Sequence, residues 1–165
     1  MIVRPETDSD IGVISELIQE AFAETPYSNG KEANILEQLR REDELTLSLV
    51  AELDGKIVGQ VAFSPVRISE TDGSWFGLGP VAVGTAMQRQ GVGTTLIEQG
   101  HKMLIDKEAS GCVLIGDPEY YQRFGYRSGN ISYADVPVEY VQWVTFSGIM
   151  PKGNITYSKA FTDHA

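Results

Sequence analysis

The stretch VAVGTAMQRQGVGTTLIE, residues 81–98, decides the fold. It begins with Val81-Ala82-Val83, a mostly β-branched segment that is typical of a strand. A polar, glycine-rich loop from Gln88 to Gly93 follows, and a helical pattern starts at Thr94. A strand that delivers a glycine-rich turn to the N-terminus of a helix exposes backbone N–H groups. We therefore expect an anion site at this point, suited to a phosphorylated ligand.

The loop itself has the pattern Gln-x-x-Gly-x-Gly, from Gln88 to Gly93. Glycine at positions 91 and 93 lets the backbone approach a pyrophosphate without a Cβ in the way. The helix dipole favours such an anion by roughly 0.3–1 kcal/mol at an exposed site, and Arg89 can add a charge contact. The alternative is an ordinary strand–helix turn in which glycine only relieves strain. The hexapeptide alone does not decide between the two.

Two other phosphate motifs do not fit the chain. A Walker loop requires Gly-Lys-Ser/Thr before its helix, and the sequence contains no such tripeptide. The segment Gly77-Leu78-Gly79-Pro80-Val81-Ala82 matches the dinucleotide fingerprint Gly-x-Gly-x-x-Ala. That fingerprint needs a helix to open within it, whereas this segment continues as a strand. The match is accidental.

Length and composition limit the classes of protein. The chain has 165 residues, a size typical of one domain, and a formal net charge of −10. The charge argues against a general nucleic-acid binder, which needs a basic surface. It permits a cationic substrate such as an amine, although acidic surfaces also serve solubility alone, the interpretation that we favour. One cysteine, Cys112, and two separated histidines exclude a disulfide framework and make a metal site unexpected.

The sequence also suggests where the protein works. The first residues, Met1 to Pro5, lack the apolar core of a signal peptide. No apolar run approaches the ~18 residues that a membrane-spanning helix needs. We therefore expect a cytoplasmic protein that does not bind a membrane.

Hydrophobic periodicity predicts a succession of strands and helices. Strands are expected at residues 2–3, 47–53, 57–68, 75–83, 112–115, 141–146 and 155–157. Helices are expected at residues 11–22, around 35–39, from Thr94 to near Gly111, and at 119–124. Turns are expected at Asp54-Gly55 and at Thr71–Ser74, where turn residues cluster. No repeat or linker interrupts this order, which indicates one α/β domain.

Gly79-Pro80 lies in the strand just before the glycine loop. Proline removes a donor from the ladder of a sheet and is tolerated at an edge or a bulge. We expect the strand to bulge here and to part from its neighbour, leaving backbone groups free for an extended ligand. A kink that binds no ligand is the alternative.

A short helix with two tyrosines follows the glycine loop in the chain, in the segment Tyr120-Tyr121-Gln122-Arg123-Phe124-Gly125-Tyr126. A phenol has an ordinary pKa near 10, is protonated at neutral pH and can donate a proton to a departing thiolate. We interpret Tyr120, Phe124 and Tyr126 as packing residues. Tyr121 is the candidate proton donor. Support for this role comes only from the strand and the glycine loop that precede it in the chain.

Together these motifs resemble the GNAT superfamily of acyl-CoA-dependent N-acyltransferases. The resemblance rests on the Val-Ala-Val strand, on Gln88-x-x-Gly91-x-Gly93 and on Tyr121-x-x-x-Gly125-Tyr126. The segments 77–83, 116–126 and 153–157 resemble the bacterial YhbS-like subgroup. The resemblance implies an α/β (α+β) GNAT fold: a mixed, mostly antiparallel twisted sheet of about six to seven strands, flanked by helices, with splayed central strands. It also implies that residues 1–165 form a single acetyltransferase domain.

The resemblance further implies an activity and a site. Acetyl-CoA, as co-substrate, is expected in the gap between the fourth and fifth strands, and an amine attacks its thioester directly. Tyr121 matches the general acid of the family, and a backbone N–H near the reacting carbonyl would stabilise the oxyanion. The expected acetyl-CoA-binding residues are Val81, Ala82, Val83, Gln88, Arg89, Gln90, Gly91, Val92, Gly93 and Thr94. No metal is expected.

The general base stays unassigned. Many relatives carry a glutamate on the fourth strand, but Trp75 to Val83 contains no acidic residue. Glu24 is a weak candidate, and a water chain is an equal one. Cys112 falls in an expected buried strand with no histidine beside it, so we interpret it as a core residue and not as a nucleophile.

Three functions remain open. The first is an N-acetyltransferase acting on an amine of a small molecule or a protein; the second is a non-catalytic acyl-CoA-binding sensor or regulatory module. An oxygen or sulfur acceptor is the third. Apolar residues near Trp143 and Phe146 fit either a homodimer contact or a buried core strand. The sequence does not identify the acceptor.

Overall fold

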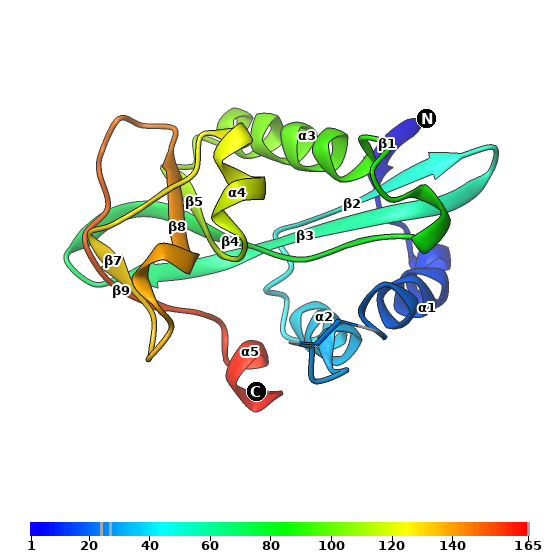
Figure 1. Cartoon of the computed structure of the whole chain (residues 1–165), viewed down its shortest axis with the longest axis horizontal. Helices are drawn as coiled ribbons and strands as arrows, with labels where there is room; N and C mark the ends of the chain where they lie inside the picture. The colour runs from blue at the N-terminus through cyan, green and yellow to red at the C-terminus, as the bar shows by residue number, and fades with distance from the viewer. Residues whose placement is uncertain (24, 27, 165) are drawn as a thin grey trace.

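The structure, a computed structural model, describes residues 1–23, 25–26 and 28–164. Its centre is a mixed, mostly antiparallel sheet in the order β1-β2-β3-β4-β5-β8-β6, while β9 pairs with β3 and β7 (Figure 1). The strands are β1 (Ile2–Pro5), β2 (Leu47–Leu53), β3 (Lys56–Ile68), β4 (Thr71–Val83), β5 (Gly111–Ile115), β6 (Arg127–Ser128), β7 (Ile131–Ser132), β8 (Val141–Thr145) and β9 (Gly153–Thr156). The described residues form nine strands, against the six to seven expected, because β6 and β7 have two residues each. Segments this short show no hydrophobic period.

Helices cover both faces of the sheet. They are α1 (Ile11–Phe22), α2 (Glu32–Arg41), α3 (Val92–Asp106), α4 (Pro118–Tyr121) and α5 (Lys159–Asp163). Figure 1 shows α3 on one side of the sheet and α1 and α2 on the other. The sequence does not predict α5. Helix α3 begins at Val92, two residues before its expected start at Thr94. None of the helices in the described ranges has the length and apolar character needed to cross a membrane.

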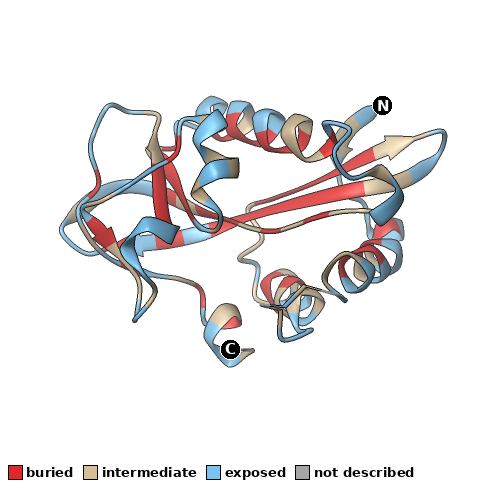
Figure 2. Cartoon of the chain, viewed as in Figure 1, coloured by how far each residue is buried: buried red, intermediate tan, exposed pale blue. Residues whose placement is uncertain are grey.

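The sheet and its helices form separate apolar layers. Alternate residues of a strand point to opposite faces, so each long strand contributes to both. Leu49, Val61 and Phe63 pack with α3, whereas Val50 and Ala62 pack with α1 and α2. Complete burial of a leucine or valine side chain stabilises a fold by about 1.5–3 kcal/mol relative to exposure. Figure 2 shows the resulting buried stripe along β2, β3 and the inner sides of the helices.

One of the two expected hairpin turns is wrong. Asp54-Gly55 does connect β2 and β3, with positive φ at both residues. The turn predicted at Thr71–Ser74 is instead the start of β4, and the chain reverses at Ser69-Glu70. Thr71 pairs with Ile68 and donates from Oγ1 to the carbonyl of Lys152 at 2.6 Å. These contacts hold a polar segment in the ladder despite its turn composition.

The two central strands separate as the sequence predicts. Strand β4 pairs in parallel with β5 only along Trp75–Gly77, although both strands continue further. Beyond that point Gly79 and Pro80 lie opposite the single residue Ala62 of β3, which is a β-bulge. The bulge turns β4 away from β5, so the edge of β4 that faces β5 is left without a strand partner.

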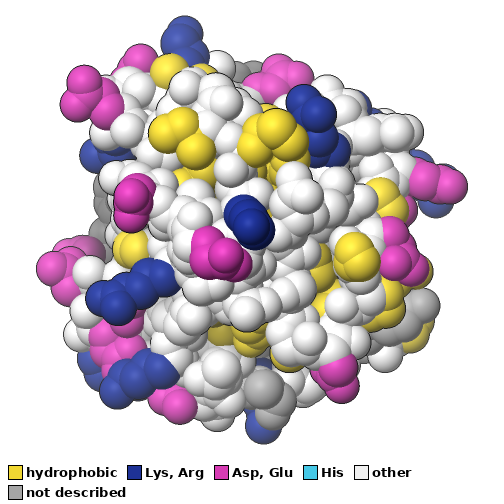
Figure 3. Space-filling view, turned by 90° about the vertical axis from the view of Figure 1, so that its left-hand side faces the viewer, with side chains coloured by type: hydrophobic (Ala, Val, Ile, Leu, Met, Phe, Trp, Pro, Cys, Tyr) yellow, Lys and Arg dark blue, Asp and Glu magenta, His cyan; other side chains and the backbone are white. Residues whose placement is uncertain are grey.

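The late strand near Trp143 belongs to the core. Trp143 is only 2% exposed and packs with Val113 of the neighbouring strand β5. Its burial favours the core-strand interpretation of this segment. On the face that contains the β3–β4 hairpin, exposed hydrophobic side chains stand in small groups among charged and polar ones (Figure 3). Cys112 is completely buried, as expected of a core residue.

Candidate active site

The N-terminus of α3 presents free backbone N–H groups. Gly91 occupies the N-cap in the left-handed conformation, φ 83°, which only glycine adopts freely. Having no side chain, it cannot cap the helix, and the following turn, Val92-Gly93-Thr94, contains no acidic residue. The N–H groups of these three residues have no carbonyl acceptor within the helix. The N-terminus is therefore available to an anion.

The loop before α3 is fixed by its own side chains. Gln88 donates from Nε2 to the carbonyl of Val83 at 3.2 Å, which ties the loop back to β4. Gln90 donates from Nε2 to the carbonyl of Ala86 at 3.3 Å. Arg89, between them, has a positive φ of 64° that a non-glycine residue rarely adopts. The loop thus holds Arg89 in a strained conformation beside the helix N-terminus.

The exposed edge of β4 carries unpaired backbone groups. The N–H of Gly84 donates to the carbonyl of Val58 on β3 at 2.9 Å. In an antiparallel pair, residues alternate between bonding the partner strand and pointing away from it. Ala82 therefore bonds β3, whereas the backbone groups of Val81 and Val83 point toward the gap between β4 and β5. An extended ligand in that gap would meet them as an added strand.

A cavity of about 570 Å³ joins these features. It is lined by Ala21, Phe22, Val81, Ala82, Val83, Met87, Gln88, Arg89, Gly91, Val92, Gly93, Thr94, Tyr120 and Arg123. The structure thus brings together all the acetyl-CoA-binding residues expected from the sequence except Gln90. Sequence reasoning missed the end of α1, Met87, Tyr120 and Arg123.

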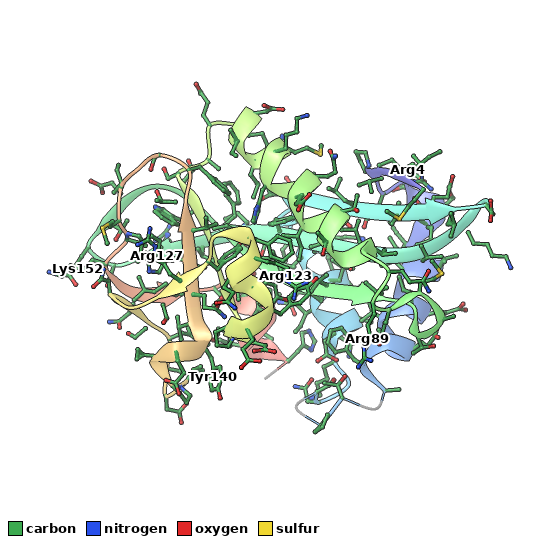
Figure 4. All side chains as sticks on the ribbon, turned by 45° about the horizontal axis from the view of Figure 1, so that its top comes forward. Arg4, Arg89, Arg123, Arg127, Tyr140 and Lys152 are labelled. Atoms are coloured by element: carbon green, nitrogen blue, oxygen red, sulfur yellow. The ribbon has the colours of Figure 1, made fainter. Side chains whose placement is uncertain are left out.

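The charged side chains that the structure shows in the cavity wall are positive, opposite in sign to the net charge of the chain. Arg89 and Arg123 line the cavity, and none of the described lining residues is acidic, in a chain of net charge −10. Arg123 donates from Nε to the carbonyl of Tyr120 at 2.8 Å, and its guanidinium lies 4.4 Å from the centroid of the Tyr120 ring. Figure 4 shows the two arginines on different elements, the loop before α3 and the turn after α4. This concentration of positive charge favours a polyanion.

The two tyrosines of α4 occupy different positions. Tyr120, which the sequence suggests as a packing residue only, also lines the cavity. Tyr121 is not among the lining residues, and its ring lies against Gly116 and Tyr126. Burial raises the pKa of Tyr121 to about 12, so its hydroxyl is protonated at neutral pH. A signal for Tyr120 exists in the sequence: Tyr120 and Arg123 are three residues apart, which places them on one side of a helix.

Behind α4 lies a buried polar pair. His101 of α3 and the hydroxyl of Tyr126 are 2.8 Å apart, within a group of aromatic rings that includes Phe124 and Phe146. Burial lowers the pKa of His101 to about 4, so the imidazole is neutral at pH 7. Phe124 and Tyr126 are packing residues, as the sequence suggests. The pair joins α3 to the segment that carries both tyrosines.

The sequence offers two further residues for catalytic roles, Cys112 as a nucleophile and Glu24 as a general base. Burial raises the pKa of Cys112 to about 12, which leaves an unreactive thiol in the core. Glu24, the weak candidate for the general base, lies outside the described residues. Among the residues that the structure describes, none of those lining the cavity is acidic, so none of them is a candidate for the general base.

Fold and site together define a GNAT-type acetyltransferase. Residues 2–129 match the family model described as the acetyltransferase (GNAT) domain, and the chain belongs to this family. It is 35% identical over 127 residues to the uncharacterized N-acetyltransferase YhbS of Escherichia coli strain K12, which is 76% of this chain and 73% of that protein.

Two solved structures are similar over nearly the whole chain. A GNAT family acetyltransferase from Brucella melitensis, in complex with acetyl-CoA, is 42% identical with a TM-score of 0.87 and 97% coverage of each chain. YhbS from Escherichia coli, in complex with CoA, is 28% identical with a TM-score of 0.88, covering 98% of this chain and 91% of that one. The predicted fold class is confirmed, splayed strands included.

Proposed function

We propose that this chain is an acetyl-CoA-dependent N-acetyltransferase, formed by one domain over residues 1–165, that transfers the acetyl group directly to an amine. The observation that carries the proposal is the cavity beside the splay. The free N–H groups of α3 and the two arginines are suited to phosphate. The unpaired edge of β4 is suited to an extended amide chain. The relatives solved with acetyl-CoA and with CoA support the same co-substrate.

Each part of the co-substrate has a proposed contact. The N–H groups of Gly91–Thr94 bind the pyrophosphate, with Arg89 adding a charge contact. The pantetheine amides pair with the outward backbone groups of Val81 and Val83, in the way one strand pairs with another. Ala82 supports this edge from the buried face. Gln88 and Gln90 act indirectly, by holding the loop in shape.

The chemistry follows from this placement. The amine nitrogen attacks the thioester carbon, forming a C–N bond, and the C–S bond then breaks to release the CoA thiolate. A backbone N–H of the β4 edge stabilises the negative oxygen without reorganising. The departing thiolate takes a proton from Tyr121, and the amine loses one to a base or to water. No acyl-enzyme intermediate forms.

Tyr121 is the proposed acid because its position matches the family motif and its hydroxyl keeps its proton at neutral pH. Tyr120 is a second candidate, since it lines the cavity. Replacing each tyrosine in turn by phenylalanine separates the two assignments.

One observation favours a second function, a non-catalytic acyl-CoA sensor. No carboxylate is found in the described wall of the cavity, so the described residues supply no evident base for an ammonium ion. A sensor would bind acetyl-CoA with the same cradle and release no thiol beyond slow hydrolysis.

A thiol-release assay with acetyl-CoA separates these functions. The acceptor panel contains polyamines, amino acids, aminoglycosides and peptides with free N-termini, together with alcohols and thiols. Acceptor-dependent release of CoA with at least one amine is expected. Tight binding of acetyl-CoA in calorimetry without release over the whole panel would support the sensor, and release only with alcohols or thiols would replace the amine as acceptor.

A further inference from the structure

We infer that Arg123 recognises the phosphate on the ribose 3′ position of CoA and makes the cavity selective for CoA over 3′-dephospho-CoA. The inference rests on the proposed function and deepens it. It assigns a specificity-determining role to a residue that neither the glycine loop nor the strand edge includes.

Contacts with Tyr120, three residues earlier in the chain, favour one side-chain conformation of Arg123. Its Nε–H donates to the carbonyl of Tyr120 at 2.8 Å, and its guanidinium lies over the Tyr120 ring at 4.4 Å. These two contacts use one donor and one face of the guanidinium. The terminal N–H groups keep the planar fork that binds phosphate oxygens in pairs. Because both contacts favour this one conformation of the side chain, less rotamer entropy is lost when a phosphate binds.

No carboxylate in the described part of the chain pairs with this guanidinium. Some arginines of this acidic chain do form ion pairs, such as Arg4 with Asp10 at 2.7 Å and Arg40 with Glu6 at 2.8 Å. Within the described residues, Arg123 has no acidic partner within 4 Å, although it lies in a chain with 23 acidic residues. An unpaired arginine in a cavity wall is suited to a ligand anion.

The position of Arg123 distinguishes it from the cradle at α3. The Tyr120 hydroxyl lies next to Gly93, whereas the Arg123 guanidinium stacks on the face of the same ring. The Tyr120 side chain therefore stands between the first turn of α3 and Arg123. The pyrophosphate of CoA already has the α3 N–H groups and Arg89. The remaining phosphate of CoA, on the ribose, is the one that needs a separate cation.

The test compares acetyl-CoA with 3′-dephospho-acetyl-CoA by calorimetry, using the full chain. The wild type is expected to bind acetyl-CoA more tightly. Arg123→Gln should weaken acetyl-CoA binding by about tenfold, the loss of one charged phosphate contact, and leave the affinity for the dephospho form unchanged. Arg89→Gln should weaken the binding of both. Lys102→Gln, which removes an exposed charge elsewhere on α3, should change neither.

Several outcomes overturn the inference. Equal weakening of both nucleotides by Arg123→Gln would assign the residue to the pyrophosphate or to packing, and no weakening would remove it from binding. If Arg123→Gln does not fold, Arg123→Lys keeps the charge without the planar fork and should retain part of the selectivity; full selectivity in that variant would contradict the role of the fork. A wild type that binds neither nucleotide would instead overturn the proposed function, while binding without selectivity overturns only the role of Arg123.

Discussion

The Tyr120 hydroxyl lies 3.0 Å from the point that a Cβ on Gly93 would occupy. Helix α4 therefore packs against the first turn of α3, and a side chain at position 93 would crowd the Tyr120 hydroxyl whether or not a ligand is bound. Gly91 differs, because the space around its missing Cβ is open and its φ of 83° is the constraint. Steric crowding therefore restricts the side chain at position 93, whereas backbone conformation restricts it at position 91.

That difference yields a sharp test of the anion site. Aspartate and asparagine have nearly the same shape, and both tolerate the left-handed conformation that Gly91 adopts. Gly91→Asp places a negative charge at the proposed pyrophosphate site, whereas Gly91→Asn does not. We expect the aspartate variant to bind acetyl-CoA at least about tenfold more weakly than the asparagine variant, because like charges repel at close range. Calorimetry measures both affinities, and equal affinities would remove the loop from phosphate binding.

Much of this site follows from local sequence. The loop from Gln88 to Gly93 and the bulge at Gly79-Pro80 are specified by glycine and proline, which restrict the backbone independently of the rest of the fold. Tyr120 and Arg123 could not be placed in the same way. Helix α4 is a single turn of four residues, so the side that faces the cavity depends on how β5 and α3 are packed.

The same limit explains the errors in the fold. Hydrophobic periodicity predicts the long strands and α1, whereas β6 and β7 are too short to show a period. At Thr71–Ser74 the local composition favours a turn, yet pairing with β3 and a hydrogen bond to Lys152 extend the strand. Tertiary contacts decide where local signals are weak.

Asp10 should make stability depend on acid pH. It accepts hydrogen bonds from Arg4 at 2.7 and 3.2 Å and from the backbone N–H of Thr7 at 2.7 Å, and these donors hold the pKa of its carboxyl well below its usual range. The unfolded chain therefore takes up the proton first. The stabilisation is complete at neutral pH and declines once the pH falls below about 4, the ordinary value for aspartate.

Urea unfolding of Asp10→Asn at pH 7 and pH 3 checks this. The variant should be less stable than the wild type at pH 7, with a smaller difference at pH 3. Glu37→Gln is the matched control, because its ion pair with Arg41 is long, 4.0 Å, and exposed, so its loss should have little effect. A difference for Asp10→Asn that is the same at both pH values would contradict the ion-pair argument.

His101 predicts a second pH dependence, in a higher range. Its pKa is about 4 in the fold because of burial and about 6.5 in an unfolded chain, so unfolding takes up a proton between these values. Stability therefore falls as the pH drops from 7 to 5, by about 2 kcal/mol from this residue alone. His101→Phe should be less stable at pH 7, since the Tyr126 hydroxyl loses its partner, but should lose less stability on acidification. Parallel stability curves for the two proteins would show that His101 does not titrate as described.

The identity of the proton donor is the last prediction. Tyr121→Phe should lower kcat by about 10²–10⁴-fold, the usual contribution of a positioned acid, with little change in acetyl-CoA affinity. Tyr120→Phe keeps the ring on which Arg123 stacks and removes only the hydroxyl beside Gly93, so we expect kcat to stay close to that of the wild type. Steady-state kinetics on any acceptor found in the thiol-release screen measures both. A large loss in Tyr120→Phe alone would move the acid to the tyrosine that lines the cavity, because the two hydroxyls differ in position and not in chemistry. Comparable losses in both variants would instead indicate that the tyrosines act as a unit, which the double variant would show by costing no more than either single change.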